Sequence, residues 1–94
     1  MNDITLNLRI HGRVQGVSYR DWTVKTANKL GLAGWVRNRE DGTVEAVVSG
    51  AAADVRQLIE KCRKGPLMAN VNQIDETPSQ TEDLPHPFER RKTA

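Results

Sequence analysis

Hydrophobic and polar residues alternate near the start of the chain, between Thr5 and His11. Leu6, Leu8 and Ile10 fall on one side of an extended segment, and the polar residues between them fall on the other. A period of two residues is typical of a β-strand with one buried face. The pattern therefore predicts a strand over residues 5–11, followed by a glycine-containing turn over residues 12–18.

In two later segments, the apolar residues recur with the period of a helix instead. Residues 19–30 predict a first helix, because Tyr19, Thr23, Ala27 and Leu30 share a face and Gly31 follows at the C′ position. Residues 52–64 predict a second helix, which Gly65-Pro66 ends. Its apolar positions follow the spacing i, i+3, i+4, i+7 (Val55, Leu58, Ile59, Cys62).

Three further strands are predicted over residues 32–38, 43–49 and, more weakly, 69–76. The first two flank the loop Arg39-Glu40-Asp41-Gly42, whose Asp-Gly pair is a hairpin signal. A polar loop with three prolines covers residues 78–87, and residues 88–90 could form a short edge strand.

The order strand, helix, strand, strand, helix, strand is that of the split βαβ arrangement, βαββαβ, of the ferredoxin-like α+β fold. Right-handed crossovers place both helices on one face of an antiparallel sheet and leave the other face more open. We expect a single domain over residues 1–94, in which residues 91–94 could be a disordered tail.

Composition adds a few limits. The 94 residues carry 14 Lys and Arg against 12 Asp and Glu, a net charge of +2 that does not indicate nucleic-acid binding. The single cysteine, Cys62, excludes an intrachain disulfide and reads as a small buried hydrophobe. With no signal peptide and no segment apolar enough to cross a membrane, we expect a cytoplasmic protein without a membrane partner.

The glycine turn, Gly12-Arg13-Val14-Gln15-Gly16-Val17-Ser18-Tyr19-Arg20, is the candidate for chemistry. Glycine permits positive φ, and successive free N–H groups form an anion-binding concavity beside a helix N-terminus. The guanidinium of Arg20 could bind two phosphate oxygens at once. On spacing alone, however, a purely structural β-to-α turn is the more ordinary interpretation.

Two motifs together resemble the acylphosphatase family. The signature Gly-Arg-Val-Gln-Gly-Val-x-aromatic-Arg stands without a gap at residues 12–20. The second signature is Gly34-Trp35-Val36-Arg37-Asn38, followed by Gly42, Val44 and Gly50. The resemblance covers residues 6–74.

This resemblance implies the fold predicted above and hydrolysis of carboxyl phosphates without a metal or other cofactor. It also implies that Arg20 binds the phosphate and that Asn38 orients the attacking water. The amides of the loop would surround the phosphate (Arg13, Val14, Gln15, Gly16, Val17, Ser18). The chain departs from the family at Phe88-Glu89-Arg90-Arg91, where Arg90 replaces an expected aliphatic residue; we expect this departure to leave the site unaffected.

Other candidate residues point to packing. Tyr19 and Trp35 are expected to be core or packing residues rather than substrate contacts, and His11 is expected to face the open side of the sheet. No Cys, His or carboxylate cluster has metal-ligand spacing, and His86 is remote from His11 in sequence, so no metal site is predicted.

Two other classes of function stay open. Acylphosphatase-like domains also occur as binding modules in larger proteins such as hydrogenase-maturation carbamoyl transferases, although a complete 94-residue chain with Arg20 and Asn38 argues against that role. A nucleic-acid-binding ferredoxin-like domain would need aromatic residues on the open sheet face, and aromatics make up 4% of the chain. We expect a monomer that acts on a small acyl phosphate, whose identity the sequence leaves open.

Overall fold

A computed structural model gives the structure and describes residues 3–80 and 83–94. Its elements follow the predicted order: β1 (Asp3–Arg13), α1 (Tyr19–Lys29), β2 (Ala33–Asn38), β3 (Val44–Ala51), α2 (Ala52–Cys62), β4 (Asn70–Pro78) and β5 (Glu89–Arg90). The α2 helix ends two residues before the predicted Lys64. Within the described ranges, neither helix is long and apolar enough to span a membrane.

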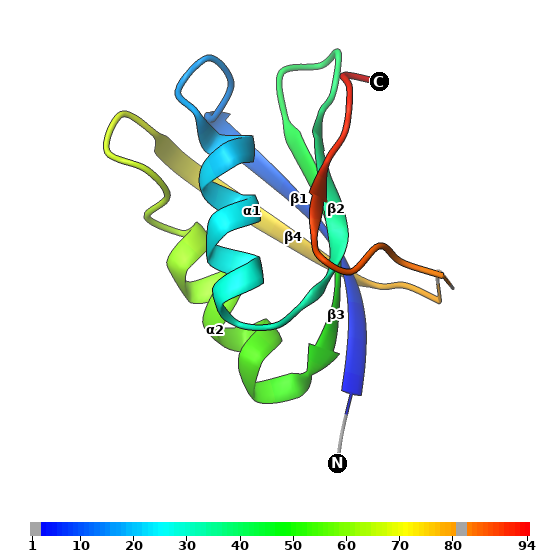
Figure 1. Cartoon of the computed structure of the whole chain (residues 1–94). Coiled ribbons are helices and arrows are strands. Elements are labelled where there is room, and N and C mark those ends of the chain that lie inside the picture. The colour runs from blue at the N-terminus through cyan, green and yellow to red at the C-terminus, as the bar shows by residue number, and fades with distance from the viewer. Residues whose placement is uncertain (1–2, 81–82) are drawn as a thin grey trace.

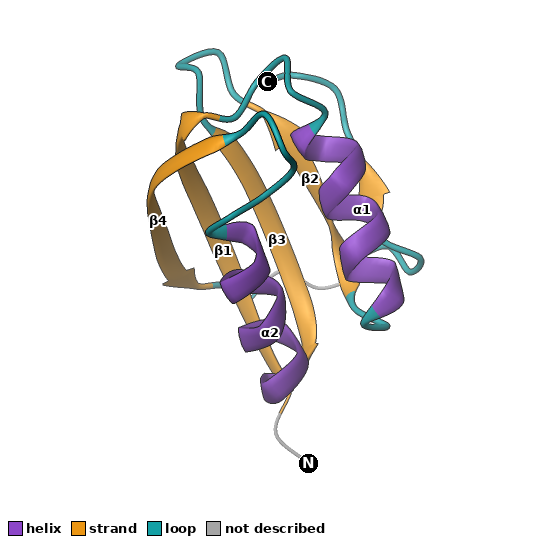
Figure 2. Ribbon diagram, turned by 90° about the vertical axis from the view of Figure 1, so that its left-hand side faces the viewer, coloured by secondary structure: helices purple, strands orange, loops and turns teal. Residues whose placement is uncertain are grey.

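The strands form one sheet in the order β4-β1-β3-β2-β5. β3 pairs antiparallel with both β1 and β2, and β4 pairs antiparallel with β1. Each helix therefore crosses between parallel strands that another strand separates, which is the split βαβ arrangement. Both helices lie on the same face of the sheet (Figures 1 and 2). These features confirm the predicted ferredoxin-like α+β fold.

The β2 edge of the sheet differs from the prediction. β5 pairs with β2 in parallel, with Trp35 opposite Glu89 and Val36 opposite Arg90, so the sheet is mixed rather than wholly antiparallel. The chain continues beside β2 after β5: Arg91 N–H donates to Val36 O at 2.8 Å, and Ala94 N–H donates to Asn38 O at 3.0 Å. Residues 91–94, which the sequence left room to be disordered, thus run along the strand that ends at Asn38.

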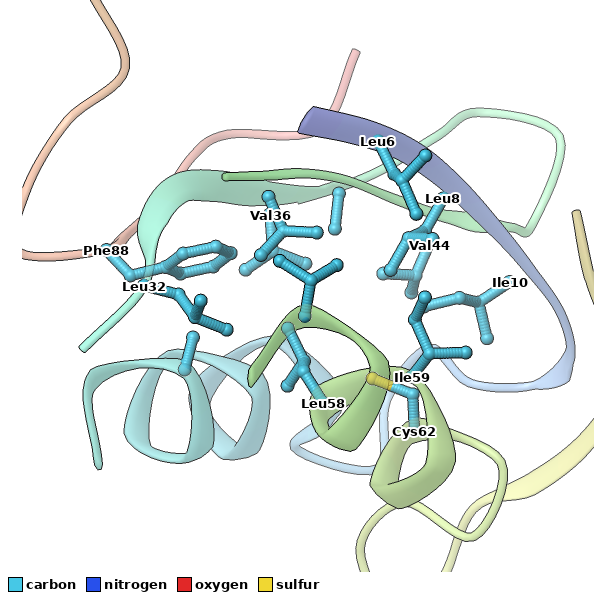
Figure 3. Close-up of a cluster of buried hydrophobic side chains, with 14 of the residues drawn as sticks. Leu6, Leu8, Ile10, Leu32, Val36, Val44, Leu58, Ile59, Cys62 and Phe88 are labelled. Atoms are coloured by element: carbon cyan, nitrogen blue, oxygen red, sulfur yellow. The ribbon is translucent and has the colours of Figure 1, made fainter. Parts of the chain in front are cut away.

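The hydrophobic core fills the space between the sheet and the helices. Figure 3 shows Leu58, Ile59 and Cys62 of α2 beneath the apolar side chains of the sheet, and all of them are buried. Burial raises the pKa of the Cys62 thiol to about 12, so it stays protonated at neutral pH. The prediction that Cys62 is a small buried hydrophobe is confirmed.

The helix-free face of the sheet is more covered than predicted. Trp35 packs there under two guanidinium groups, with Arg37 at 4.7 Å and Arg91 at 5.0 Å from the ring centroid. Glu45 is also buried on this face, where Asn7 Nδ2 and Arg37 Nε each donate to its carboxylate at 2.9 Å. Long polar side chains, rather than helices, cover Trp35 and Glu45 on this side of the sheet.

Candidate functional site

The loop over residues 14–18 connects the end of β1 to the start of α1, and glycine makes its entry possible. A β-bulge lies between His11 and Gly12 where β1 pairs with β4. Gly12 has φ +127°, and a Cβ at this position would lie 2.1 Å from the Asn70 carbonyl oxygen. No side chain fits that approach, so the β4 backbone fixes where the loop leaves the sheet.

The backbone of the loop is arranged to receive an anion. Gly16 and Ser18 both have left-handed conformations, with φ of 73° and 63°. Within the described part of the chain, no hydrogen bond is donated by the amides of residues 14–18, and the Ser18 side chain does not cap α1. The loop amides and the first turn of α1 therefore leave several N–H donors free, at the positive end of the helix dipole.

Three side chains hold this loop in place. Val14 and Tyr19 are buried at its two ends, and the Tyr19 hydroxyl donates to the Cys62 carbonyl at 2.7 Å. In the middle, Gln15 Nε2 donates to two carbonyl oxygens of the hairpin, that of Arg39 at 2.7 Å and that of Thr43 at 2.9 Å. Gln15 thus fixes the loop against the β2–β3 hairpin that follows Asn38.

Asn38 is the last residue of β2. Its backbone pairs with Val44 of β3 and accepts a hydrogen bond from Ala94 N–H, so the main chain is held on both sides. The side-chain amide makes no hydrogen bond to any residue that the structure describes. A free amide on a fixed backbone offers one donor group and one acceptor to a bound molecule.

These elements enclose a pocket of about 260 Å³ at the N-terminus of α1. Eight residues line it (Val14, Gly16, Ser18, Tyr19, Arg20, Asp21, Asn38, Arg90). They come from the loop, the first turn of α1, the end of β2 and β5. The tertiary structure therefore brings Arg20 and Asn38, 18 positions apart in sequence, to one small polar pocket.

The six predicted loop residues divide into two groups. Val14, Gly16 and Ser18 line the pocket, whereas Arg13, Gln15 and Val17 do not. Arg13 is the exposed last residue of β1, and Val17 packs partly against the core. The role of Gln15 as a brace was not predicted, because it depends on carbonyl groups that only the folded hairpin presents.

The structure also adds two residues that the sequence analysis did not include. Arg90 and Asp21 both line the pocket, and their side chains form an ion pair with Arg90 Nη1 and Asp21 Oδ1 at 3.0 Å. The prediction that Arg90 leaves the site unaffected is therefore wrong. The parallel placement of β5 carries Arg90 to the first turn of α1, and no sequence pattern signalled that pairing.

The remaining candidates behave as packing or surface residues. Tyr19 and Trp35 are buried, as predicted, and Tyr19 also forms part of the pocket wall. His11 lies on the helix-free face, where its Nε2 is 2.9 Å from an oxygen of Asp75, and it does not line the pocket. A larger hollow of about 820 Å³ lies between the two helices, but it contains none of the predicted site residues.

The pocket therefore combines two cations, one carboxylate, free backbone N–H donors and a free amide. Guanidinium and N–H groups that converge on one point bind tetrahedral anions. An amide beside them can hold a water molecule against the bound anion. This set of groups suits binding and hydrolysis of a phosphate ester or anhydride.

Comparison with known proteins gives consistent matches over nearly the whole chain. The sequence model of the family described as Acylphosphatase matches residues 6–90. An acylphosphatase of Rhodospirillum rubrum is 56% identical over 81 residues, which cover 86% of this chain and 89% of that protein. An acylphosphatase of Nitrobacter hamburgensis is 45% identical over 92 residues, which cover 96% of this chain and 93% of that protein.

A comparison with solved structures also finds acylphosphatases. The structure of an acylphosphatase from Coxiella burnetii superposes with a TM-score of 0.89 at 33% identity, over 96% of this chain and 94% of that one. The resemblance inferred from the two sequence motifs is thereby confirmed.

Proposed function

The chain belongs to the acylphosphatase family, a family of hydrolases that act on acyl phosphates, and we propose how its own residues carry out that reaction. Arg20 and the free amides of residues 14–18 hold the phosphoryl group, and Asn38 orients the attacking water. The observation that supports these roles is the single pocket in which Arg20, the loop and Asn38 meet.

The reaction needs positioning more than it needs a strong acid or base. The acyl group leaves as a carboxylate, which is a stable anion and requires no protonation. The main demand is to neutralise the phosphoryl oxygens and to align the water with phosphorus. Arg20 and the N-terminus of α1 supply fixed positive charge and donors at that place.

Asn38 acts on the nucleophile. Its carbonyl oxygen accepts a hydrogen bond from the water, and its N–H₂ group can donate to a phosphoryl oxygen. The water oxygen forms the new bond to phosphorus while the bond from phosphorus to the acyl oxygen breaks. Because an amide is not a base, the proton of the water passes to a phosphoryl oxygen of the substrate, and the products are a carboxylate and inorganic phosphate.

We propose that this chemistry is independent of metal, because Arg20 and the loop donors take the role that Mg²⁺ has in other phosphoryl-transfer enzymes. The test is hydrolysis of benzoyl phosphate by the purified protein in excess EDTA. We expect turnover that neither EDTA nor added Mg²⁺ changes. Phosphate binding without turnover by the folded protein would instead favour the binding-module alternative and overturn this proposal.

A cytoplasmic monomer remains our proposal for the state of the protein. Among the described residues, the large hydrophobic side chains that are exposed are Leu67 and Met68, which offer a small apolar surface for association. Light scattering should therefore give the mass of one chain, 10.5 kDa. A mass of twice that value would contradict the monomer, and recovery from a membrane fraction would contradict the location.

A further inference from the structure

Arg90 stands where the family resemblance implies an aliphatic residue, and it also lines the pocket. It ends β5, beside the first turn of α1, and its guanidinium lies 3.0 Å from the carboxylate of Asp21. Both side chains line the same pocket as Arg20 and Asn38. The pocket therefore holds a second cation that the proposed mechanism does not use.

The ion pair that holds Arg90 is weak enough for a ligand to displace. The side chains of Arg90 and Asp21 are 51% and 62% exposed. An exposed pair of this kind changes an equilibrium by about fivefold at most, because water screens both charges. An anion that enters the pocket can therefore compete with Asp21 for Arg90.

The position of Asp21 indicates which part of the substrate reaches Arg90. A carboxylate is an unfavourable neighbour for a dianionic phosphoryl group, which instead has Arg20 and the free loop amides as donors. Four lining residues are exposed: Gly16 and Ser18 of the loop, which the proposed mechanism assigns to the phosphoryl group, and Arg90 and Asp21, which are left to face the acyl portion of the substrate.

We propose that Arg90 binds a negatively charged group on the acyl portion of the substrate. The preferred substrates are then monophosphorylated dicarboxylic acids and other acyl phosphates with a second anionic group. Arg90 is a specificity-determining residue in this proposal, which rests on the proposed function of the pocket.

The test compares substrates that differ by one charge. Benzoyl phosphate and its 3- and 4-carboxy derivatives share a rigid ring, and kcat/KM is measured for each. We expect Arg90→Gln to lower the ratio of kcat/KM for the better carboxy derivative to kcat/KM for benzoyl phosphate by roughly 2- to 5-fold, the range for an exposed ionic contact. Lys92→Gln removes the same charge two residues further along and should leave the ratio unchanged.

Asp21→Asn provides a second variant with the opposite expected effect. It frees Arg90 and removes a repelling carboxylate, so the ratio should rise. In the wild type, the ratio should also fall as NaCl is added, because salt screens exposed charges. Circular dichroism on each variant shows that the fold is retained.

The outcomes separate this proposal from the function on which it rests. If the wild type hydrolyses benzoyl phosphate but Arg90→Gln leaves the ratio unchanged, the proposal is overturned. Equal losses with both kinds of substrate would place Arg90 on the phosphoryl group and overturn it as well. A wild type that hydrolyses none of the substrates would overturn the proposed function itself, and this inference with it.

Discussion

Arg20 Nη1 donates a hydrogen bond to the carbonyl oxygen of Arg91 at a distance of 3.1 Å. The two residues lie 71 positions apart, and the contact exists because β5 and the tail after it run beside β2. One nitrogen of the Arg20 guanidinium is thus held by the tail, which fixes the orientation of the planar group. The other N–H donors of that group remain for a ligand in the pocket.

The first prediction concerns this geometry. Arg20→Lys keeps the charge but loses the planar fork, so we expect kcat/KM for benzoyl phosphate to fall by roughly 10²-fold or more. Arg56→Lys is the matched control, because Arg56 pairs with Glu76 on the surface away from the pocket. Activity within a few-fold of wild type in Arg20→Lys would refute the proposed role.

The second prediction separates binding of the phosphate from orientation of the water. Asn38→Ala removes the free amide but not the backbone pairing of β2, so kcat should fall by roughly 10- to 10³-fold. The inhibition constant of inorganic phosphate should change by no more than about threefold, the scale of a single weak contact. Asn72→Ala, on β4, is the control. If phosphate binding weakened as much as kcat, Asn38 would be a binding residue instead.

The third prediction concerns the entry to the loop. Gly12→Ala places a Cβ against the Asn70 carbonyl oxygen, whereas Gly31→Ala, also at positive φ, meets no atom within 4 Å. We expect Gly31→Ala to cost about 1 kcal/mol of unfolding free energy from backbone strain, and Gly12→Ala at least about 2 kcal/mol more. Urea unfolding measures both. Equal losses would show that β4 does not constrain the loop.

The fourth prediction concerns pH. Burial raises the pKa of Glu45, but hydrogen bonds from Asn7 and Arg37 outweigh burial, so the pKa is lowered from its ordinary value of 4.5. A lowered pKa means that the charged form stabilises the fold above pH 4.5 and that this stabilisation is lost as pH falls through the lower folded value.

Glu45→Gln should therefore cost about 1–3 kcal/mol of unfolding free energy at pH 7. The difference from wild type should shrink as pH falls below 4.5 and through the lower folded pKa, where the wild-type carboxylate also becomes neutral. Thermal or urea unfolding at pH 7 and at a series of lower pH values provides the measurement, and Glu40→Gln, at an exposed position, is the control. A difference that persisted unchanged at low pH would contradict the assigned charge interactions.

Much of the fold was predictable because its elements carry local signals. The alternation of Leu6, Leu8 and Ile10 requires only that one strand face be buried, and the structure buries it. Gly31, at the end of α1, likewise reflects a local need for positive φ. In the same way, Arg20 and Asn38 were identified from short motifs, and the structure places both at one pocket.

The helix-free face and the β2 edge could not be predicted in this way. Glu45 interrupts an apolar strand, and nothing in its neighbours along the chain shows that Asn7 and Arg37 will surround it. The parallel pairing of β5 with β2 depends on the path of the chain after β4, which a two-residue strand does not specify.

The sequence by itself determined the order of the elements, the position of the glycine turn and the choice of Arg20 and Asn38 as site residues. Each of these depends on residues that are neighbours along the chain. Only the tertiary structure decided what surrounds them. Gln15 braces the loop, Arg91 holds Arg20, and Arg90 enters the pocket beside Asp21. These contacts join segments 24 to 71 positions apart, and their geometry is set by the pairing of strands and not by any local pattern.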